Sequence, residues 1–274
     1  MKKSVRIQSV DLIRAIGILS MVLIHISKYL LTIIDKQLVL YRLINSFGQI
    51  AAPFFLTAVG ISLVISMKKQ KNEGFVHTLK RGLFLIVIGL LFMTLWPGDI
   101  LHYIGVFLII TLLLLYLPKI WRIVVAFIFL IVAPIALNYI DYMAGWERLA
   151  YSLSGFWTVS GFFNNLLFNG FHPMFPWIFF VIMGSVIGEY MLQSIEKKKE
   201  EKFVSYGTII GVIFMIASWA VVSYMNIPID FYPTTVSYIL FHFGFCLLCF
   251  SLFFHTLFHI HYYQNKYLNI PKTL

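Results

Sequence analysis

Residues 11–34 read DLIRAIGILSMVLIHISKYLLTII, and this stretch decides the fold class. A helix needs about 20 mostly apolar residues to cross a bilayer, and the stretch is long enough. A cleaved signal peptide would have a shorter apolar core that ends in small residues of the A-x-A type, which this stretch lacks. We therefore predict that it forms a retained first membrane span.

The composition of the whole chain extends this prediction. Of the 274 residues, 60% are apolar and 12% are charged, whereas a soluble domain has about 25% charged residues. A mean hydropathy of +0.88 excludes a disordered chain as well as a soluble globule. We predict an all-α, polytopic membrane bundle that forms one domain over residues 1–274, with about eight spans. The candidate spans are 10–34, 43–67, 80–96, 100–117, 120–139, 173–195, 204–225 and 234–258.

The basic residues predict how this bundle is oriented. The formal net charge is +10, with 21 Lys and Arg residues against 11 Asp and Glu residues. Cytoplasmic loops of membrane proteins are enriched in Lys and Arg. With a cytoplasmic N-terminus, the basic residues on or near the outer side are Lys28, Lys36, Arg42 and Arg148. This asymmetry favours an even number of spans in the cytoplasmic membrane, and it explains the charge without nucleic-acid binding.

Ionisable residues on the inner side of the membrane form an inner layer, with Arg6, Asp11 and Arg14 at the start of the first span and Glu189 near the end of the sixth. Asp11 and Arg14 are three residues apart, so they share a helix face and can form an ion pair. In a structural interpretation, Asp11 favours the positive end of the helix and Arg14 reaches the lipid headgroups. In a functional interpretation, the layer holds the phosphates of a cytosolic ligand, for which Arg is well suited. The spacing leaves both interpretations open.

A second, outer layer is informative because ionisable residues are costly within a bilayer. It consists of His25 in the first span, Asp99 and His102 at the start of the fourth, and His172 before the sixth. His102 follows Asp99 by three residues, so a carboxylate can orient an imidazole as in a catalytic triad. Because imidazole exchanges protons near neutral pH, we predict acid–base chemistry in this layer. The structural alternative is that each histidine is hydrogen-bonded to a neighbouring helix.

Metal binding is another alternative for the same histidines. Three histidines can hold a catalytic zinc ion, but His25, His102 and His172 belong to separate spans and lack the local spacing of a metal motif. Cys246 and Cys249 form one CxxC pair within an apolar run, which is a weak signal for metal or redox function. We expect no metal, and we expect the two cysteines to pack between helices.

Four segments together carry a family resemblance. They are R-x4-D-x2-R at 6–14 followed by MVLIH at 21–25, APFFLTAVGIS at 52–62, GDILHYIG at 98–105, and FHPMFPW at 171–177. In this order they resemble the bacterial membrane acyltransferases with a heparan-alpha-glucosaminide N-acetyltransferase-like catalytic domain. The chain differs from the family pattern at Ala15, where relatives usually have Gly. Relatives also usually continue for two or three further spans, so we expect the chain to lack the last helices of the family.

The resemblance implies an activity and the molecules that take part in it. The expected reaction transfers an acyl group, usually acetyl, from cytosolic acetyl-CoA to an acceptor across the membrane, expected to be a glycan or an amino sugar. The resemblance also implies a catalytic histidine near the outer side, and His25 is the residue that matches it. The other expected partner is the lipid bilayer, and a homo-oligomer is compatible with the sequence.

These expectations assign roles to the candidate residues. The catalytic candidates are His25, Asp99 and His102, and the substrate-binding candidates are Arg6, Asp11, Arg14 and His172. The alternative is a non-enzymatic transporter or scaffold of the same fold, in which intramembrane His and Asp residues form a proton relay. The sequence contains no evident internal repeat of the kind found in inverted-repeat transporters, which favours the enzyme.

Overall fold

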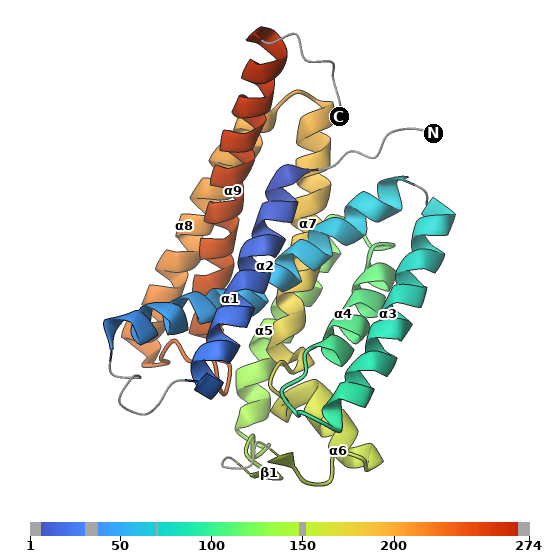
Figure 1. The fold of residues 1–274 in the computed structure, drawn as a ribbon, viewed down its shortest axis with the longest axis vertical. Coiled ribbons are helices and arrows are strands. Elements are labelled where there is room, and N and C mark those ends of the chain that lie inside the picture. Colours follow the sequence, from blue (N-terminus) through green and yellow to red (C-terminus); the bar gives the residue numbers. More distant parts are fainter. Residues whose placement is uncertain (1–6, 31–37, 70, 148–151, 268–274) are drawn as a thin grey trace.

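The computed structural model describes residues 7–30, 38–69, 71–147 and 152–267 of the chain. This part of the chain is a bundle of helices (Figure 1), which confirms the predicted all-α membrane architecture. The principal helices are α1 (Gln8–Leu30), α2 (Val39–Lys69), α3 (Lys71–Met93), α4 (Leu101–Leu114), α5 (Lys119–Leu137), α7 (Met174–Glu196), α8 (Glu200–Met225) and α9 (Val236–Tyr267).

Each predicted span corresponds to one of these helices. Among the described residues, 7 helices are long and apolar enough to cross a membrane. α4 is shorter, with 14 residues, which corresponds to about 21 Å at 1.5 Å per residue. It therefore falls short of the about 30 Å of a hydrocarbon core. α3 begins at Lys71 rather than near residue 80, and Glu73 in its first turn stabilises this earlier start.

The two ends of the bundle differ in which segments they carry. α1 begins and α9 ends at the same end (Figure 1), as expected for an even number of crossings. We call this the inner end, because the basic residues predict that it faces the cytoplasm. The connection between α5 and α7 lies at the opposite end, which we call the outer end.

α2 is the central helix of the bundle. It is strongly tilted (Figure 1) and packs against both α1 and α7. Gly60 of α2 and Gly184 of α7 allow the second of these contacts, because a Cβ atom on Gly60 would lie 2.1 Å from the carbonyl oxygen of Val181 and one on Gly184 would lie 2.3 Å from that of Thr57. Small residues that let two backbones approach closely are typical of helix packing in membranes.

The outward faces of the bundle are apolar. Ile209, Ile213, Ile216 and Trp219 on α8 are exposed large hydrophobic side chains. Such a surface is unfavourable in water and suits contact with lipid tails. The buried core instead gathers aromatic and aliphatic side chains of α2, α4, α7 and α9. This distribution agrees with a protein that crosses the membrane several times.

The connection between α5 and α7 caps the outer end. It contains a short antiparallel strand pair, β1 (Trp146–Glu147) with β2 (Ser152–Leu153), then α6 (Val159–Asn164) and a π-helical turn at Asn165–Asn169. The sequence predicts an interfacial or re-entrant segment here, because the connection is too aromatic to extend into water and too polar to span the membrane. Its short elements lie against the end of the bundle (Figure 1), where they help to position the site described next.

Candidate active site

A cavity at the outer end collects residues from five separate parts of the chain. Its empty volume is about 740 Å³, including the part that is open to the surroundings. It is lined by residues of α1, α2, the α3–α4 connection, the segment before α7 and the segment before α9. These residues are Met21, Ile24, His25, Asn45, Gly48, Gln49, Ala51, Ala52, Trp96, Gly98, Ile100, Phe171, His172 and Phe231.

His25 of α1 is half-buried in the wall of this cavity. Its Nδ1 lies 2.6 Å from the carbonyl oxygen of Met21, one turn earlier in the helix. A carbonyl oxygen can only accept a hydrogen bond, so Nδ1 carries the proton and Nε2 of the neutral ring has the lone pair. The ring also packs edge-on against Trp96, with the ring centroids 5.1 Å apart. The geometry therefore fixes both the tautomer and the orientation of a basic nitrogen.

His172 lines the same cavity. It lies just before α7, and its ring is held among aromatic neighbours, with centroid distances of 4.7 Å to Trp177 and 5.6 Å to Phe231. Trp177 is itself fixed, because its indole nitrogen donates a hydrogen bond of 2.9 Å to the hydroxyl of Thr234. The structure thus brings together two of the predicted site residues, His25 and His172, that are far apart in the sequence.

Asp99 and His102 form the predicted pair, but they do not line the cavity. The carboxylate oxygen Oδ2 of Asp99 accepts a hydrogen bond of 3.0 Å from Nδ1 of His102, and both side chains are buried. The flanking residues Gly98 and Ile100 line the cavity instead. Nε2 of His102 is buried and has no hydrogen-bond partner among the described residues. The pair therefore lies behind the cavity wall, and neither residue is hydrogen-bonded to His25.

Gly89 of α3 explains how this pair can pack so tightly. A Cβ atom at Gly89 would lie 2.2 Å from the backbone nitrogen of His102 and 2.7 Å from Oδ2 of Asp99. No real Cβ contact is that short, so only glycine lets α3 approach the start of α4 at this level. Oδ2 of Asp99 also accepts a hydrogen bond of 3.0 Å from the backbone nitrogen of Leu101. The carboxylate therefore caps α4 while it orients His102.

Tyrosine hydroxyls connect the wall of the cavity to the outer cap. Tyr103 is fully buried and donates a hydrogen bond to Asn165, while its ring lies 6.4 Å from that of His172. Tyr142, in the outer connection, donates a hydrogen bond of 2.6 Å to the carbonyl oxygen of Gly170. Burial raises the pKa of Tyr142 well above its ordinary value, so this hydroxyl stays protonated and keeps donating. These bonds hold the segment that carries His172.

Three cavity residues whose side chains carry polar groups were not predicted from the sequence. Trp96 lines the cavity, and its indole nitrogen is buried without a hydrogen-bond partner in the described part of the chain. Asn45 and Gln49 add two amides from α2. The sequence could have indicated the two amides. They lie one helical turn apart in an otherwise apolar predicted span, and polar side chains inside a membrane face a bundle interior or a cavity.

The inner layer forms in part as predicted. Nη1 of Arg14 lies 3.5 Å from Oδ1 of Asp11, which confirms the predicted pair. Nη2 of Arg14 also donates a hydrogen bond to the hydroxyl of Ser62 on α2. Arg6 lies outside the described residues. The pair is thus fixed to α2 near the inner end, far from the cavity that contains His25.

A cleft between α2, α5 and α7 contains charged residues that were not among the site candidates. Its empty volume is about 1450 Å³, including the part open to the surroundings. Arg122, only 3% exposed, pairs with Glu189 of α7, and Lys119 lies 3.7 Å from the same carboxylate. Lys68 of α2 pairs with Glu196 at the mouth. We call this feature the inner cleft. Tertiary packing of α2, α5 and α7 brings these charges together, and their spacing in the sequence does not reveal the pairs.

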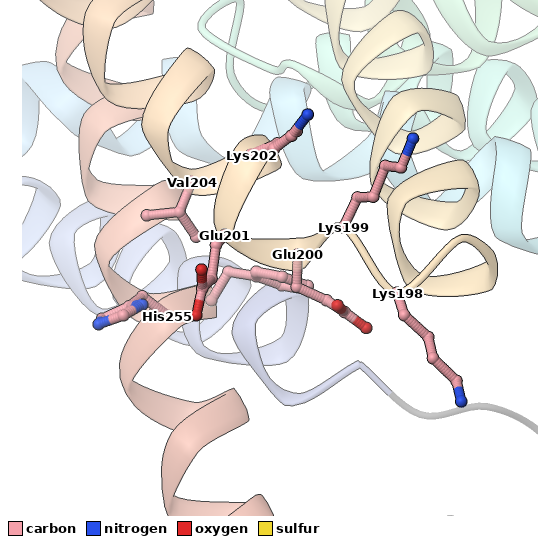
Figure 2. A pocket seen from close by; sticks show the side chains of 8 residues that line it. Lys198, Lys199, Glu200, Glu201, Lys202, Val204 and His255 are labelled. Carbon is pink, nitrogen blue, oxygen red and sulfur yellow. The ribbon is translucent and has the colours of Figure 1, made fainter.

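A further hollow lies at the inner end, where the turn between α7 and α8 faces α9 (Figure 2). Its lining includes Lys198, Lys199, Glu200, Glu201, Lys202 and His255. Figure 2 shows Lys199 and Lys202 extending in one direction and Lys198 in another, so the cations do not converge on one point. A short run of lysines and glutamates of this kind is typical of a solvated loop, so this hollow is not a site candidate.

The structure also bears on the metal alternative. Among the described residues, no three or more His, Cys, Asp or Glu side chains gather closely enough to hold a metal ion. Cys246 and Cys249 are free cysteines on α9, and Cys246 is buried. Burial between helices agrees with the structural interpretation of the CxxC pair.

The comparison with known families gives a clear match. The model of the heparan-alpha-glucosaminide N-acetyltransferase catalytic domain matches residues 6–227. This range contains α1 to α8 and nearly all of the residues that line the outer cavity. No curated protein and no solved structure matches the chain. Because the match covers most of the chain and confirms the resemblance of its motifs, the protein belongs to the heparan-alpha-glucosaminide N-acetyltransferase catalytic-domain family.

Proposed function

We propose that the protein is a membrane acetyltransferase that moves an acetyl group from cytosolic acetyl-CoA to a glycan or amino sugar on the outer side of the cytoplasmic membrane. Membership in the family supports acetyl transfer and acetyl-CoA as the donor. The outer cavity is the proposed place of reaction. The single observation that carries this proposal is that His25 and His172 line one cavity at the outer end, where the acceptor is expected.

His25 is the proposed general base or transient acyl carrier. Its Nδ1 is committed to the carbonyl of Met21, which leaves the lone pair of Nε2 for chemistry. As the amine or hydroxyl of the acceptor attacks the thioester carbonyl, Nε2 takes the proton of the acceptor. The new C–N or C–O bond forms, the C–S bond breaks, and the proton passes to the CoA thiolate. General base catalysis by histidine typically accelerates a reaction by about 10²–10⁴-fold.

The remaining outer residues have supporting roles in this proposal. His172 contributes to the acceptor site, where its ring is held rigidly by Trp177 and Phe231. Asp99 and His102 are positioning residues, because they fix the α3–α4 connection that presents Gly98 and Ile100 to the cavity. A rigid supporting shell keeps reactive groups within the small tolerances that catalysis requires.

In this proposal, acetyl-CoA binds from the inner end. Arg6, Asp11 and Arg14 are proposed to shape the acyl-CoA entrance, with Arg14 fixed by Asp11 and Ser62. Arg14 and His25 are on the same helix, 11 residues apart in the sequence, which is about 16 Å along the axis. An extended donor held by its phosphates at the inner end would therefore reach toward the outer cavity along α1.

An acetyl-transfer assay tests the proposal. The purified protein in liposomes is given acetyl-labelled acetyl-CoA and glucosamine, and the sugar fraction is separated and counted. We expect labelled N-acetylglucosamine that depends on the protein. The opposite result is the absence of label on glucosamine and on amino-sugar oligosaccharides, together with solute flux driven by a pH gradient. That outcome would support the transporter alternative.

A further inference from the structure

The N-terminus of α5 lines the inner cleft, and it is suited to an anion. α5 begins at Lys119, beside Glu189 of α7, which lies seven residues before the end of α7 at Glu196. Seven residues correspond to about 10 Å, so the N-terminus of α5 lies about 10 Å along α7 from its inner end, where Pro118 and Lys119 line the cleft. Pro118, the N-cap residue, lines the cleft and provides no side-chain cap. The free N–H groups and the helix dipole at such an end favour a negative charge.

Buried and half-exposed cations line the cleft around the N-terminus of α5. Arg122 follows in the first turn of α5, and its Nε is buried without a hydrogen-bond partner among the described residues. Lys119 and Lys68, whose side chains are 36% and 43% exposed, approach from α5 and α2. The carboxylates of Glu189 and Glu196 also line the cleft. Three cations against two carboxylates leave the described lining with one surplus positive charge.

The walls of the cleft are apolar and continue into the surface that faces lipid. Val64, Leu115 and Leu192 line the cleft. Leu117 and Tyr116 also line it, and they are 39% and 65% exposed. α4 ends short of the inner ends of α3 and α7 (Figure 1), and the residues that follow its end, 115–118, line the cleft. Exposed aromatic rings such as Tyr116 are typical of the membrane–water interface.

We propose that the inner cleft binds an anionic phospholipid of the surrounding leaflet. Its phosphodiester lies at the N-terminus of α5, and the part of its acyl chains nearest the headgroup packs against the apolar walls. A phosphodiester carries one negative charge, which matches the surplus of the lining. Basic pockets between membrane helices on the cytoplasmic side are a known form of lipid-headgroup site. The proposal does not depend on acyl transfer, since it concerns a different surface and is measured without turnover.

The hollow in Figure 2 provides the structural contrast. It has three lysines and two glutamates, as many charges of each sign as the inner cleft. However, its lysine side chains diverge (Figure 2), and Val204 and Phe254 are its apolar lining residues. If net charge alone attracted lipid, both hollows would bind it equally. The N-terminus of α8 also lines the hollow in Figure 2, but Glu200 and Glu201 in its first turn already place negative charge there, whereas the first turn of α5 has no acidic residue. Convergent cations, a helix N-terminus without acidic residues and apolar walls predict binding at the inner cleft alone.

Native mass spectrometry of the detergent-purified full chain tests this proposal. The protein is mixed with phosphatidylglycerol or phosphatidylcholine, and the bound lipid is counted. We expect the wild type to retain phosphatidylglycerol in preference to phosphatidylcholine. The variant Lys68→Gln/Lys119→Gln should bind phosphatidylglycerol more weakly, by about fivefold for each lysine removed. The control Lys199→Gln/Lys202→Gln, with the same change of charge in the other hollow, should bind like the wild type.

Each remaining outcome contradicts the proposal. Equal retention of the two lipids by the wild type excludes an anion site, and this comparison needs no variant. Equal loss of phosphatidylglycerol in both double variants shows that the charge of the inner end, not the cleft, attracts lipid. Displacement of phosphatidylglycerol by excess coenzyme A would assign the cleft to the phosphates of a soluble ligand instead.

Discussion

The outer cavity and the inner cleft are both hollows between helices of one bundle, but their polar groups differ in kind. The described lining of the outer cavity presents imidazole, indole and amide groups, from residues such as His25, Trp96 and Asn45. The inner cleft instead presents ion pairs, with Arg122 and Lys119 around Glu189. Uncharged groups that can exchange or share protons suit chemistry, whereas fixed ion pairs suit the binding of anions and the packing of helices.

The difference also shows how each half of the bundle is stabilised. Near the outer end, carbonyl groups and aromatic rings fix the side chains, as Met21 does for His25. Near the inner end, charge pairing between α5 and α7 does the same. A change in the outer cavity should therefore alter activity more than stability, and a change in the buried Arg122–Glu189 pair of the inner cleft should do the reverse. The following predictions test this contrast.

The largest effect is expected at His25. His25→Ala removes the nitrogen that would take the acceptor proton, so the rate of acetyl transfer should fall by about 10²–10⁴-fold. The exposed His255 provides a matched control, and His255→Ala should leave the rate unchanged. Initial rates with labelled acetyl-CoA measure both, and thermal unfolding should show similar stability for the two variants. A wild-type rate of acetyl transfer by His25→Ala would contradict the catalytic role proposed for His25.

Removal of the buried cation should have the largest effect on stability. Arg122→Met removes the buried partner of Glu189, which is 31% exposed and keeps Lys119 at 3.7 Å, so the cost should approach about 3 kcal/mol, the lower end for breaking a buried ion pair. The free energy of unfolding in detergent micelles measures this loss. The double variant Arg122→Met/Glu189→Met removes both charges and should recover most of the stability, because an apolar replacement of a buried pair is often neutral. If the double variant is as unstable as the single one, the pair is not what joins α5 to α7.

Close packing between α2 and α7 should produce a smaller change. Gly60→Ala places a Cβ atom 2.1 Å from the carbonyl oxygen of Val181, so the two helices must move apart. Overpacking of this kind lowers the free energy of unfolding by about 1–3 kcal/mol. Gly17→Ala is the comparison, since its nearest neighbour, the carbonyl oxygen of Ala51, lies at 3.2 Å. Equal losses in the two variants would contradict the packing geometry described for α2 and α7.

The exposed lysines of the inner cleft should have the smallest effect on stability. Lys68→Gln and Lys119→Gln each remove a partly exposed ion pair, which is worth about 0–1 kcal/mol. Chemical unfolding of the single variants should therefore give curves close to that of the wild type. A larger loss would show that these lysines stabilise the bundle itself, rather than provide a surface for an anionic headgroup.

Much of the fold could be predicted from the sequence, since long apolar runs have few alternatives in a bilayer. The described part of the run at 11–34 belongs to α1, which begins at Gln8. The basic residues predicted that the first and last helices have their free ends on the same side. Helix boundaries were less predictable. α3 begins at Lys71 because a charged, helix-compatible segment continues the span, and apolar length alone does not reveal such an extension.

The site could be predicted in part. His25 and His172 stood out because ionisable groups are costly in a membrane, and the structure places them in one cavity. Asp99 and His102 were correctly paired from their spacing, but spacing could not show that the pair lies behind the cavity wall. The pairing of Arg122 with Glu189 could not be predicted, because the two residues are distant in the sequence and only tertiary packing brings them together.

The sidedness of the reaction tests the central claim most directly. Acetyl-labelled acetyl-CoA is sealed on the inner-end side of vesicles that contain uniformly oriented protein, and a membrane-impermeant amino-sugar oligosaccharide is added on the other side. The account predicts label on the external oligosaccharide with the wild type and none with His25→Ala. Label that appears only when donor and acceptor share one compartment would contradict an active site at the outer end.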